Sequence, residues 1–369
     1  MKSLLFFLIL FFVICCTSKN TEVLYVGTYS TSDAEGIYRY EFDNKNGLLR
    51  FIDVIPNKLN PSFIAFHPDL LVLYAVNEVS GSYQIDSGSV TSYDLMDNKT
   101  FRIISQKATL GNHPCHVCVS PDGKFVSVAN YTNGGICVFD VLPDGGLGDF
   151  IQVIKHLGYG PDTVRQKVPH AHSSQFSADG KLLIAADLGT DMLYFYSFSA
   201  DSACFVVAQE PVRFVSGSGP RHFDFSKDQR FIYIMNELSS TVGVIEKIDG
   251  VYKLIETVSS LPANFNQTSY GADIHLSGDG RFVYCSNRGH NSIAIFSRDL
   301  NTGRIKLIGN EPVQGDWPRN FSISQDGKFL LVANQQSNNI TIFSINENGL
   351  LSFTHKSISV PNPVCLIFK

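Results

Sequence analysis

The sequence predicts an all-β fold, a seven-bladed β-propeller whose ring is closed by pairing of the C-terminal strand with the N-terminal blade. Three observations support this prediction. A unit of about fifty residues recurs along the chain, and each copy carries short strands around an Asp-containing turn. Beyond the N-terminal segment, no stretch of ten or more residues follows the 3.6-residue period of a helix. The composition agrees, because 28 Phe and 15 Tyr stand against 4 Met, and aromatic residues favour strands.

The recurring unit consists of a short strand, a turn containing Asp, an apolar strand that ends in Asn or Asp, and a third strand. The turn Asp residues are separated by 53, 57, 49, 51 and 47 residues. In all six copies an Asn or Asp follows the turn Asp eight positions later: Asp69 with Asn77, Asp122 with Asn130, Asp179 with Asp187, Asp228 with Asn236, Asp279 with Asn287, and Asp326 with Asn334. An Asp-Gly turn between alternating apolar runs is a hairpin signal, and units of this length are typical of propeller blades.

The two ends of the chain supply a seventh blade. The runs 24–29 and 36–42 resemble the second and third strands of a blade, but no first strand precedes them. The run 363–368 resembles a first strand with nothing after it. Pairing of these ends closes the ring and removes exposed sheet edges. We therefore expect residues 23–369 to form one domain.

The N-terminal segment is expected to be a targeting signal rather than part of the fold. The apolar run Leu4–Ile14 is too short to span a bilayer, and it has the length of the core of a secretory signal. It ends at a sequence similar to a bacterial lipoprotein processing site, with Cys16 as the acylated residue. We therefore expect a signal peptide over residues 1–15, a tether over 16–22, and an exported protein held in the periplasm or cell envelope by a lipid anchor.

The charge balance and the strand pattern argue against two other classes of function, nucleic-acid binding and metal binding through the C-x-x-C motif. Lys and Arg total 29 against 34 Asp and Glu, so no basic surplus is present to bind nucleic acid. Cys115 and Cys118 form a C-x-x-C motif, but positions three apart on a strand point to opposite faces of the sheet. We therefore expect two buried thiols rather than two ligands of one metal ion.

Two alignment columns are uniform between the six copies and are expected to serve the blades. Eight positions before the turn Asp stand small or rigid residues, which we interpret as the entry into strand one: Pro61, Pro114, Ala171, Pro220, Gly271 and Pro318. The Asn or Asp at the end of strand two is interpreted as an Asx turn. The alternative is a calcium site formed by these Asn and Asp side chains.

Two neighbouring columns break the repeat. Seven positions before the turn Asp stand Ser62, Cys115, His172, Arg221, Ala272 and Arg319, and nine after it stand Glu78, Tyr131, Leu188, Glu237, Arg288 and Gln335. The start of strand one lies beside the end of strand two in an antiparallel pair, so both columns should surround one mouth of the ring. His172, Arg221, Glu237 and Arg288 come from three consecutive blades, and we predict that they form an active site there. Arg319, His170 and Glu78 are the candidate substrate-binding residues.

Several stretches resemble the lactonase family of seven-bladed propellers, whose best-known members are bacterial 6-phosphogluconolactonases. They are Gln166–Ser173, Ala186–Asp191, Gly219–Phe223, Asn236–Thr241, Ser286–His290, Pro318–Phe321 and Val332–Ser337. By local motif, the proposed catalytic His, Arg, Glu and Arg of the family fall on His172, Arg221, Glu237 and Arg288. The family also contains fungal carboxymuconate cyclases, which form a lactone. The resemblance therefore implies a lactonase, most simply a 6-phosphogluconolactonase, with a lactonising cyclase as the alternative.

Lactone hydrolysis requires a deprotonated water and a stabilised oxyanion. His172 is the expected general base, because the unperturbed pKa of an imidazole lies near 6.5, and Glu237 would orient it. One of Arg221 and Arg288 would stabilise the oxyanion, while the other, with Arg319 in reserve, would bind a phosphate or carboxylate. This chemistry needs no metal or other cofactor. The third alternative is a non-catalytic exported propeller that binds a glycan or a protein partner, for which Trp317 is the candidate exposed aromatic residue.

Overall fold

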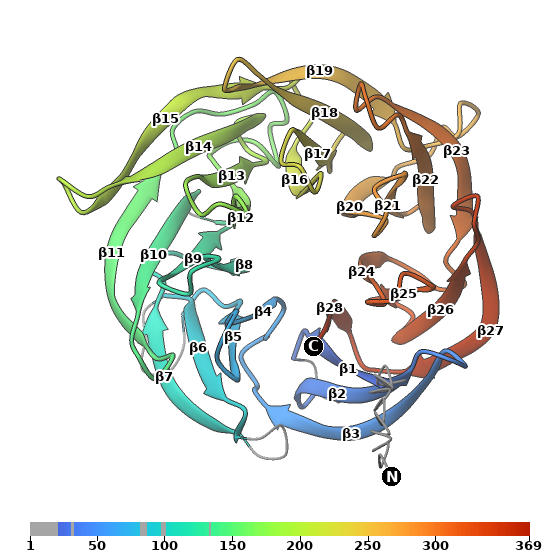
Figure 1. Ribbon diagram of the computed structural model, residues 1–369, viewed down its shortest axis with the longest axis horizontal. Helices are drawn as coiled ribbons and strands as arrows, with labels where there is room; N and C mark the ends of the chain where they lie inside the picture. Colours follow the sequence, from blue (N-terminus) through green and yellow to red (C-terminus); the bar gives the residue numbers. More distant parts are fainter. Residues whose placement is uncertain (1–20, 31–32, 82–86, 97–100, 133) are drawn as a thin grey trace, which may run out of the picture.

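The computed structural model describes residues 21–30, 33–81, 87–96, 101–132 and 134–369. Within these residues the chain forms seven four-stranded antiparallel sheets and no α-helix. The sheets are arranged as blades around one axis, and the first strand of each blade lies closest to that axis (Figure 1). The predicted fold class and the predicted number of blades are confirmed.

The strands of each blade follow one another from the axis to the rim. Blade 1 contains β28 (Pro363–Phe368), β1 (Thr21–Thr28), β2 (Gly36–Asp43) and β3 (Leu48–Pro56). Blade 2 contains β4 (Ile64–Phe66), β5 (Val72–Asn77), β6 (Ser89–Asp94) and β7 (Arg102–Ala108). Blade 3 contains β8 (Pro114–Val119), β9 (Phe125–Asn130), β10 (Gly135–Val141) and β11 (Leu147–Lys155). Blade 4 contains β12 (Ala171–Phe176), β13 (Leu183–Asp187), β14 (Met192–Ser199) and β15 (Cys204–Arg213).

The remaining three blades complete the ring. Blade 5 contains β16 (Pro220–Phe225), β17 (Phe231–Asn236), β18 (Thr241–Ile248) and β19 (Val251–Ser259). Blade 6 contains β20 (Tyr270–Leu276), β21 (Phe282–Arg288), β22 (Ser292–Arg298) and β23 (Ile305–Pro312). Blade 7 contains β24 (Pro318–Ile323), β25 (Phe329–Asn334), β26 (Asn339–Ile345) and β27 (Leu351–Ser359).

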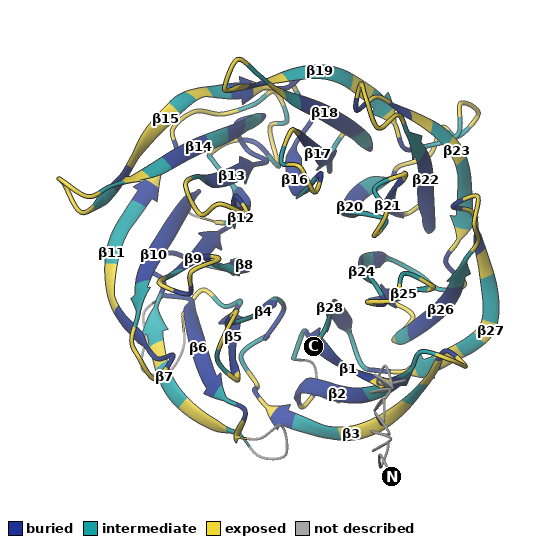
Figure 2. Cartoon of the chain, in the orientation of Figure 1, coloured by how far each residue is buried: buried dark blue, intermediate teal, exposed yellow. Residues whose placement is uncertain are grey.

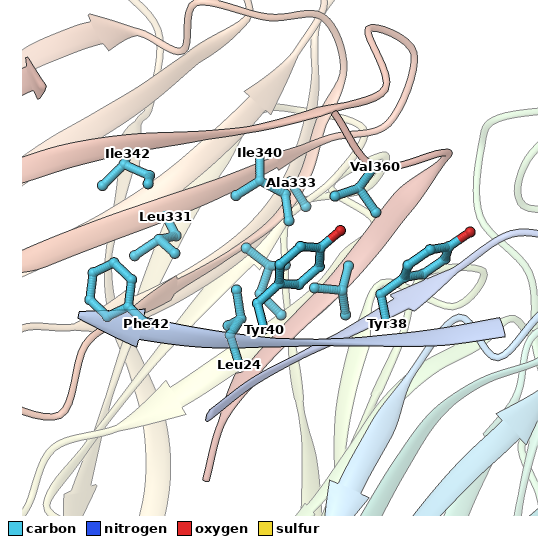
Figure 3. Close-up of a cluster of buried hydrophobic side chains, with 11 residues drawn as sticks. Leu24, Tyr38, Tyr40, Phe42, Leu331, Ala333, Ile340, Ile342 and Val360 are labelled. Atoms are coloured by element: carbon cyan, nitrogen blue, oxygen red, sulfur yellow. The ribbon is translucent and has the colours of Figure 1, made fainter. Parts of the chain in front are cut away.

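The ring is closed as the sequence predicts. Strand β28 pairs antiparallel with β1, with Leu24 opposite Phe368 and Gly27 opposite Cys365. The closed blade then packs against blade 7 through a buried cluster in which Phe42 and its neighbours meet Leu331 and Ile342 (Figure 3). Burial of each large apolar side chain contributes about 1.5–3 kcal/mol, so the seam between the two chain ends is a stable part of the core.

Burial follows the position of a strand in its blade. The second strands are almost completely buried, as in β5 and β17, whereas most residues of the rim strands β3 and β15 are exposed or half-buried (Figure 2). Each blade buries its two faces against the neighbouring blades, and most of the exposed strand residues lie on the outermost strand. This pattern explains why the second strands are the most apolar segments of each repeat.

The repeated turn has a defined hydrogen-bonding role. In blade 3, Ser120 Oγ donates to Asp122 Oδ1 at 2.7 Å and accepts from Phe125 N at 2.9 Å. The same Ser-to-Asp bond recurs at Ser177, Ser226, Ser277 and Ser324. A Gly follows the Asp where the backbone is left-handed, as at Gly123 with φ +70°. These turns lie at one end of the blades, which we call the turn face; the opposite end, where strand one begins and strand two ends, is the mouth face.

The uniform Asn and Asp column is buried on the mouth face, but its bonds differ from the expectation. An Asx turn occurs at Asp187, whose Oδ1 accepts from Thr190 N at 3.0 Å. Asn236 and Asn334 instead donate to Thr241 Oγ1 and Thr341 Oγ1, which lie on the adjacent third strands. In these two blades the amide therefore ties strand two to strand three, because a buried amide needs partners and the third strand supplies a hydroxyl. In blade 3, Asn130 Nδ2 instead donates to Thr109 O, in the connection from blade 2.

The chain before the ring carries no described structure. Strand β1 begins at Thr21, and the expected signal run Leu4–Ile14 and the expected acylated Cys16 lie outside the described residues. In the part of the chain that is described, no helix has the length and apolar character needed to cross a bilayer.

Candidate active site

The first strands of six blades carry a bulge near their start, on the mouth face, whereas the short β4 of blade 2 pairs regularly. In blade 3, Pro114 pairs with Asn130 and His116 with Ala129, so that Cys115 has no partner in the ladder. A bulged residue leaves the ladder, and its side chain is aimed in a new direction. The same position is skipped at His172, Arg221, Arg319 and Val364, and in blade 6 the pairing skips both Ala272 and Asp273.

The two columns that break the repeat meet at one cavity. Its volume is about 370 Å³, and its lining residues are Glu78, Cys115, Tyr131, Arg165, His172, Glu237, Tyr270, Arg288, Trp317, Arg319 and Gln335. Of the predicted site residues, His172, Glu237, Arg288, Arg319 and Glu78 therefore line one cavity. Arg221 does not line it, and neither does His170.

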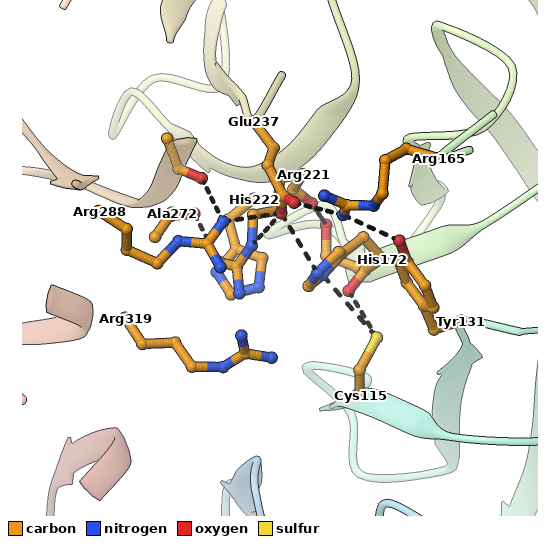
Figure 4. A network of polar contacts seen from close by, with 12 residues as sticks. Cys115, Tyr131, Arg165, His172, Arg221, His222, Glu237, Ala272, Arg288 and Arg319 are labelled. Atoms are coloured by element: carbon orange, nitrogen blue, oxygen red, sulfur yellow. Dashed lines mark hydrogen bonds and ion pairs between the residues drawn. The ribbon is translucent and has the colours of Figure 1, made fainter. Parts of the chain in front are cut away.

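Glu237 is the centre of the polar network (Figure 4). Its side chain is 3% exposed, and Oε2 lies 3.1 Å from Arg221 Nε and 2.9 Å from Arg288 NH2. Its other oxygen, Oε1, accepts a hydrogen bond from Arg165 NH2 at 2.5 Å. Burial alone would raise the pKa of Glu237, but Arg288, Arg221 and Arg165 outweigh it and hold that pKa well below its usual range. Glu237 is therefore a permanent carboxylate.

Two of the three arginines are fixed by backbone groups as well. Arg221 NH1 donates to Ala272 O at 2.6 Å, and Arg288 NH2 donates to Gly271 O at 2.9 Å. Arg221 is only 2% exposed and lies behind Glu237, whereas Arg288 faces the cavity and lies over the ring of Trp317. The two predicted arginines are thus present, but Arg221 orients the carboxylate rather than reaching the cavity.

His172 lies between a carboxylate and a thiol. Its Nε2 is 3.9 Å from Glu237 Oε2, and its Nδ1 is 3.8 Å from Cys115 Sγ. Burial, together with the positive charges of Arg221 and Arg319, holds the pKa of His172 well below the value near 6.5 expected from the sequence. The imidazole is therefore neutral at physiological pH. An anion bound near the arginines would offset their charge, raise the pKa of His172 and so make it a stronger base.

Arg319 lies on the other side of the cavity, opposite Glu237 (Figure 4). Its NH2 donates to Tyr29 OH at 2.7 Å, and Tyr29 OH donates to Glu78 Oε1 at 2.9 Å. Ser62 Oγ donates to the second oxygen of Glu78. Among the described residues Arg319 forms no ion pair, and its hydrogen bond to Tyr29 OH leaves its charge uncompensated. That positive charge is therefore available to a ligand in the cavity.

His170 and Trp317 have roles that differ from the expectations. His170 stacks on Tyr131 with ring centroids 4.5 Å apart, and its Nδ1 is 2.8 Å from Tyr131 O, so it supports the cavity wall from outside. Trp317 lies under Arg288 and lines the cavity instead of forming an exposed aromatic surface.

A second polar layer lies deeper along the axis. His222 Nδ1 is 2.7 Å from Asp273 Oδ1, and His275 Nε2 is 3.0 Å from Asp273 Oδ2. Asn320 Nδ2 also donates to Asp273 Oδ2, at 2.5 Å. The rings of His172 and His222 have centroids 5.3 Å apart, so this layer packs directly beneath the cavity.

Sequence reasoning missed three contributors to the site. Arg165 lies in the connection between β11 and β12, outside the repeat, although the 57-residue spacing in this region is the longest of the five. Tyr29 occupies in blade 1 the column that holds Glu237 elsewhere, and it would have been found by extending the alignment to the seventh blade. Asp273 is the extra residue of the blade 6 bulge, for which the repeat gives no signal.

The cysteines and possible metal sites are also defined in the described part of the chain. Its six cysteines are free thiols; Cys115 faces the cavity while Cys118 packs against the core between blades 3 and 4, which confirms the opposite orientations expected for this pair. No group of three or more His, Cys, Asp or Glu side chains in the described ranges is arranged to hold a metal ion.

Comparison with known proteins gives one consistent family. Residues 23–368 match the family model described as lactonase, 7-bladed beta-propeller. The chain is 34% identical over 348 residues to the 6-phosphogluconolactonase of Bacillus subtilis (strain 168), covering 93% of this chain and 97% of the relative. It is 35% identical over 307 residues to a 6-phosphogluconolactonase of Formosa agariphila, covering 81% and 86%. The solved structure of the Pseudomonas aeruginosa periplasmic gluconolactonase superposes with a TM-score of 0.86 at 35% identity, covering 94% of this chain and 99% of that one.

Proposed function

This chain belongs to the lactonase family of seven-bladed β-propellers, and we propose that it opens 6-phosphogluconolactone to 6-phosphogluconate. The observation that carries the proposal is that one cavity brings a neutral imidazole, His172, beside a permanent carboxylate and several guanidinium groups. The two curated relatives described above, both named 6-phosphogluconolactonase, support the choice of substrate.

The charge of the cavity favours an anionic substrate. Four guanidinium groups, of Arg165, Arg221, Arg288 and Arg319, lie in or directly behind it, against the two carboxylates of Glu78 and Glu237. This leaves a local excess of two positive charges in a chain whose net charge is −5. A concave site of one sign attracts a ligand of the other, and a phosphate monoester supplies about that charge near neutral pH.

We assign the general-base role to His172. A water between the imidazole and the lactone carbonyl carbon attacks that carbon while His172 accepts one of its protons. The negative charge of Glu237 stabilises the imidazolium that forms. Collapse of the tetrahedral oxyanion breaks the bond from the carbonyl carbon to the ring oxygen, and the imidazolium returns the proton to that oxygen. The carboxylic acid product then releases one proton to solvent.

Arg319 is the group best placed to bind the lactone carbonyl. It lines the cavity, it forms no ion pair among the described residues, and its charge already acts on His172. A fixed cation aimed at a developing oxyanion lowers the barrier more than it stabilises the ground state. Arg288 supports it from the Glu237 side, and Glu78, held by Tyr29 and Ser62, accepts hydrogen bonds from the sugar hydroxyls.

The test is a lactone panel assayed by base consumption, with phosphorylated and unphosphorylated sugar lactones and a carboxymuconate. We expect hydrolysis of 6-phosphogluconolactone, and replacement of His172 by Ala should reduce its rate at least about a hundredfold. Unchanged rates for a folded His172→Ala protein would remove His172 as the base. Formation of a lactone from the muconate would favour the cyclase, and inactivity on the whole panel would favour a binding protein.

We propose that the reaction needs no metal or other cofactor, because the arginines supply the positive charge that a metal would bring. Parallel assays in EDTA and in added calcium test this. Equal rates are expected in both, and loss of activity in EDTA that calcium restores would contradict the proposal.

We also propose that the protein is exported and anchored through Cys16. The apolar run Leu4–Ile14 and the periplasmic origin of the Pseudomonas relative support export. Glu22, at the start of β1, accepts hydrogen bonds from Gln325 N in a turn of the turn face, so a tether would leave the ring opposite the cavity. Replacement of Cys16 by Ser should move the protein from the membrane fraction to the soluble fraction; retention in the membrane would exclude acylation at Cys16.

A further inference from the structure

Arg165 is the one arginine around Glu237 that does not come from a strand. It lies in the segment 156–170, which is the longest connection between any two blades. The backbone around it is well held: Asp162 Oδ1 accepts from Val164 N at 2.8 Å and from Arg165 N at 2.9 Å. Gln166 is fully buried and donates to Leu188 O and Asp191 Oδ1, each at 2.8 Å. The base of the Arg165 side chain is therefore fixed at the cavity rim.

The head group of Arg165 reaches across the rim. Its NH2 donates to Glu237 Oε1 at 2.5 Å and to Tyr131 OH at 3.0 Å, and its guanidinium lies 5.9 Å from the ring centroid of Tyr270. These partners come from three different blades. Arg165 and Arg319 approach the cavity from opposite sides of His172 (Figure 4).

Exposure separates Arg165 from the other two arginines that contact Glu237. The Arg165 side chain is 33% exposed, against 2% for Arg221 and 6% for Arg288. Arg221 and Arg288 also bind backbone carbonyls and hold Oε2, so they cannot leave without breaking buried bonds. Arg165 alone among the three holds Oε1 and meets solvent, so it can exchange its carboxylate for an incoming anion at a lower cost than Arg221 or Arg288 could.

We propose that Arg165 is the specificity residue for the anionic arm of the substrate, and that a phosphate ester draws it away from Glu237 Oε1. This inference rests on the proposed lactonase function. Binding of the phosphate would then do two things: it anchors the substrate at the rim, and it leaves one oxygen of Glu237 without its third cation. A less compensated carboxylate stabilises the His172 imidazolium better, so recognition of the remote phosphate is coupled to general-base catalysis.

The first experiment compares 6-phosphogluconolactone with gluconolactone in the wild type, in Arg165→Met, and in the control Lys167→Met, which removes an exposed cation of the same connection outside the cavity. Rates are corrected for spontaneous ring opening. Arg165→Met should lower the preference for the phosphorylated lactone, measured as the ratio of the two kcat/KM values, about 10- to 100-fold, the range of a charge-assisted pair. The kcat/KM for gluconolactone should not fall, because the variant leaves Glu237 Oε1 without its third cation in every molecule. An equal loss on both lactones would show that Arg165 only supports Glu237, and would overturn the proposal.

The second experiment separates anchoring from activation. Phosphite, supplied as a free dianion, should increase kcat/KM for gluconolactone in the wild type and in Lys167→Met but not in Arg165→Met. Absence of activation in the wild type would overturn the coupling to Glu237.

Binding of inorganic phosphate, measured by calorimetry, gives a readout that is independent of hydrolysis. It should weaken about 10- to 100-fold in Arg165→Met and be unchanged in Lys167→Met. If the wild type hydrolyses neither lactone yet binds phosphate through Arg165, the lactonase proposal fails while the anion site stands. Equal phosphate binding by wild type and Arg165→Met would overturn the site itself.

Discussion

The two ends of the blades use the same strands for different purposes. At the turn face, five blades carry the same Ser-to-Asp hydrogen bond with lengths of 2.6–2.7 Å, and the residues hardly vary. At the mouth face, the bulged position holds Cys115 in one blade, His172 in the next, Arg221 in the third and Arg319 further round. A residue that recurs in every blade stabilises that blade, whereas a residue that occurs in one blade contributes to the site that the whole ring forms.

The bulge explains how one fold can keep a uniform turn face and a variable mouth face. A regular ladder would direct each side chain into the contact between neighbouring blades, where size and polarity are constrained by packing. A skipped residue is free of that constraint, so its identity can change without disturbing the blade. The mouth face can therefore acquire chemistry while the turn face keeps the geometry.

The largest expected effect comes from Glu237→Gln at the mouth face. The substitution keeps the shape but leaves Arg221 and Arg288 buried beside no carboxylate. Removal of one partner of a buried ion pair costs about 3–5 kcal/mol, so the free energy of unfolding should fall by that amount, and kcat should fall with it. The control is Glu246→Gln on β18 of the same blade, whose partner Arg230 is 47% exposed; it should cost no more than about 1 kcal/mol. Denaturant unfolding measures the loss of unfolding free energy in both variants. Equal losses in the two variants would contradict the central role of Glu237.

The next effect concerns catalysis rather than folding. Arg319→Met should lower kcat about 10²- to 10³-fold, the range measured when one oxyanion donor is removed, with a much smaller change in stability. Arg304→Met is the matched control, because Arg304 is 57% exposed and pairs with Glu256 on the outside of the ring. A raised KM with unchanged kcat for Arg319→Met would show that Arg319 binds the substrate in its ground state and does not stabilise the oxyanion.

The sequence predicted the scaffold more completely than the site, and particular residues show why. The Asp-to-Asp spacing predicted six of the seven blades, and the unmatched strands at the two chain ends predicted the seventh blade and the closure, because strand period and turn chemistry are local signals. The same frame brought His172, Glu237 and Arg288 to one mouth. Arg165 was missed because it belongs to a connection rather than to the repeat. The low pKa of His172 was missed because it depends on burial and on charges from other blades.

At the turn face a single substitution should reduce stability without affecting catalysis. Ser277→Ala removes the bond from Ser277 Oγ to Asp279 Oδ1, at 2.6 Å, and the one it accepts from Phe282 N, at 3.0 Å. The free energy of unfolding should fall by about 1 kcal/mol per bond lost at most, because water can reach these groups. The lactonase kcat should stay within about twofold of wild type. A large fall in kcat would show that the two faces are coupled, and would weaken the division drawn between them.

The smallest expected effect tests the layer between the two faces. Burial alone would lower the pKa of His275, but Asp273 raises it to about 9, and Asp224, with Oδ2 4.0 Å from Nδ1, adds to that increase. The folded state therefore holds this proton more tightly than the unfolded state, whose imidazole titrates near 6.5. The contribution of His275 to stability is fully present below about pH 6.5 and is lost as the pH rises through about 9. Because the side chain is 40% exposed, the effect should be modest.

Unfolding midpoints measured from pH 6 to pH 10 should fall in the wild type, and His275→Gln should remove part of that fall while starting from a lower value at pH 6. The difference between the two proteins isolates His275 from the lysines and tyrosines that titrate in the same range. If the difference is independent of pH, the Asp273 network is held by hydrogen bonds rather than by the charge of His275. The layer beneath the cavity would then belong with the turn face, as scaffold, because its charge would add nothing that packing does not already supply.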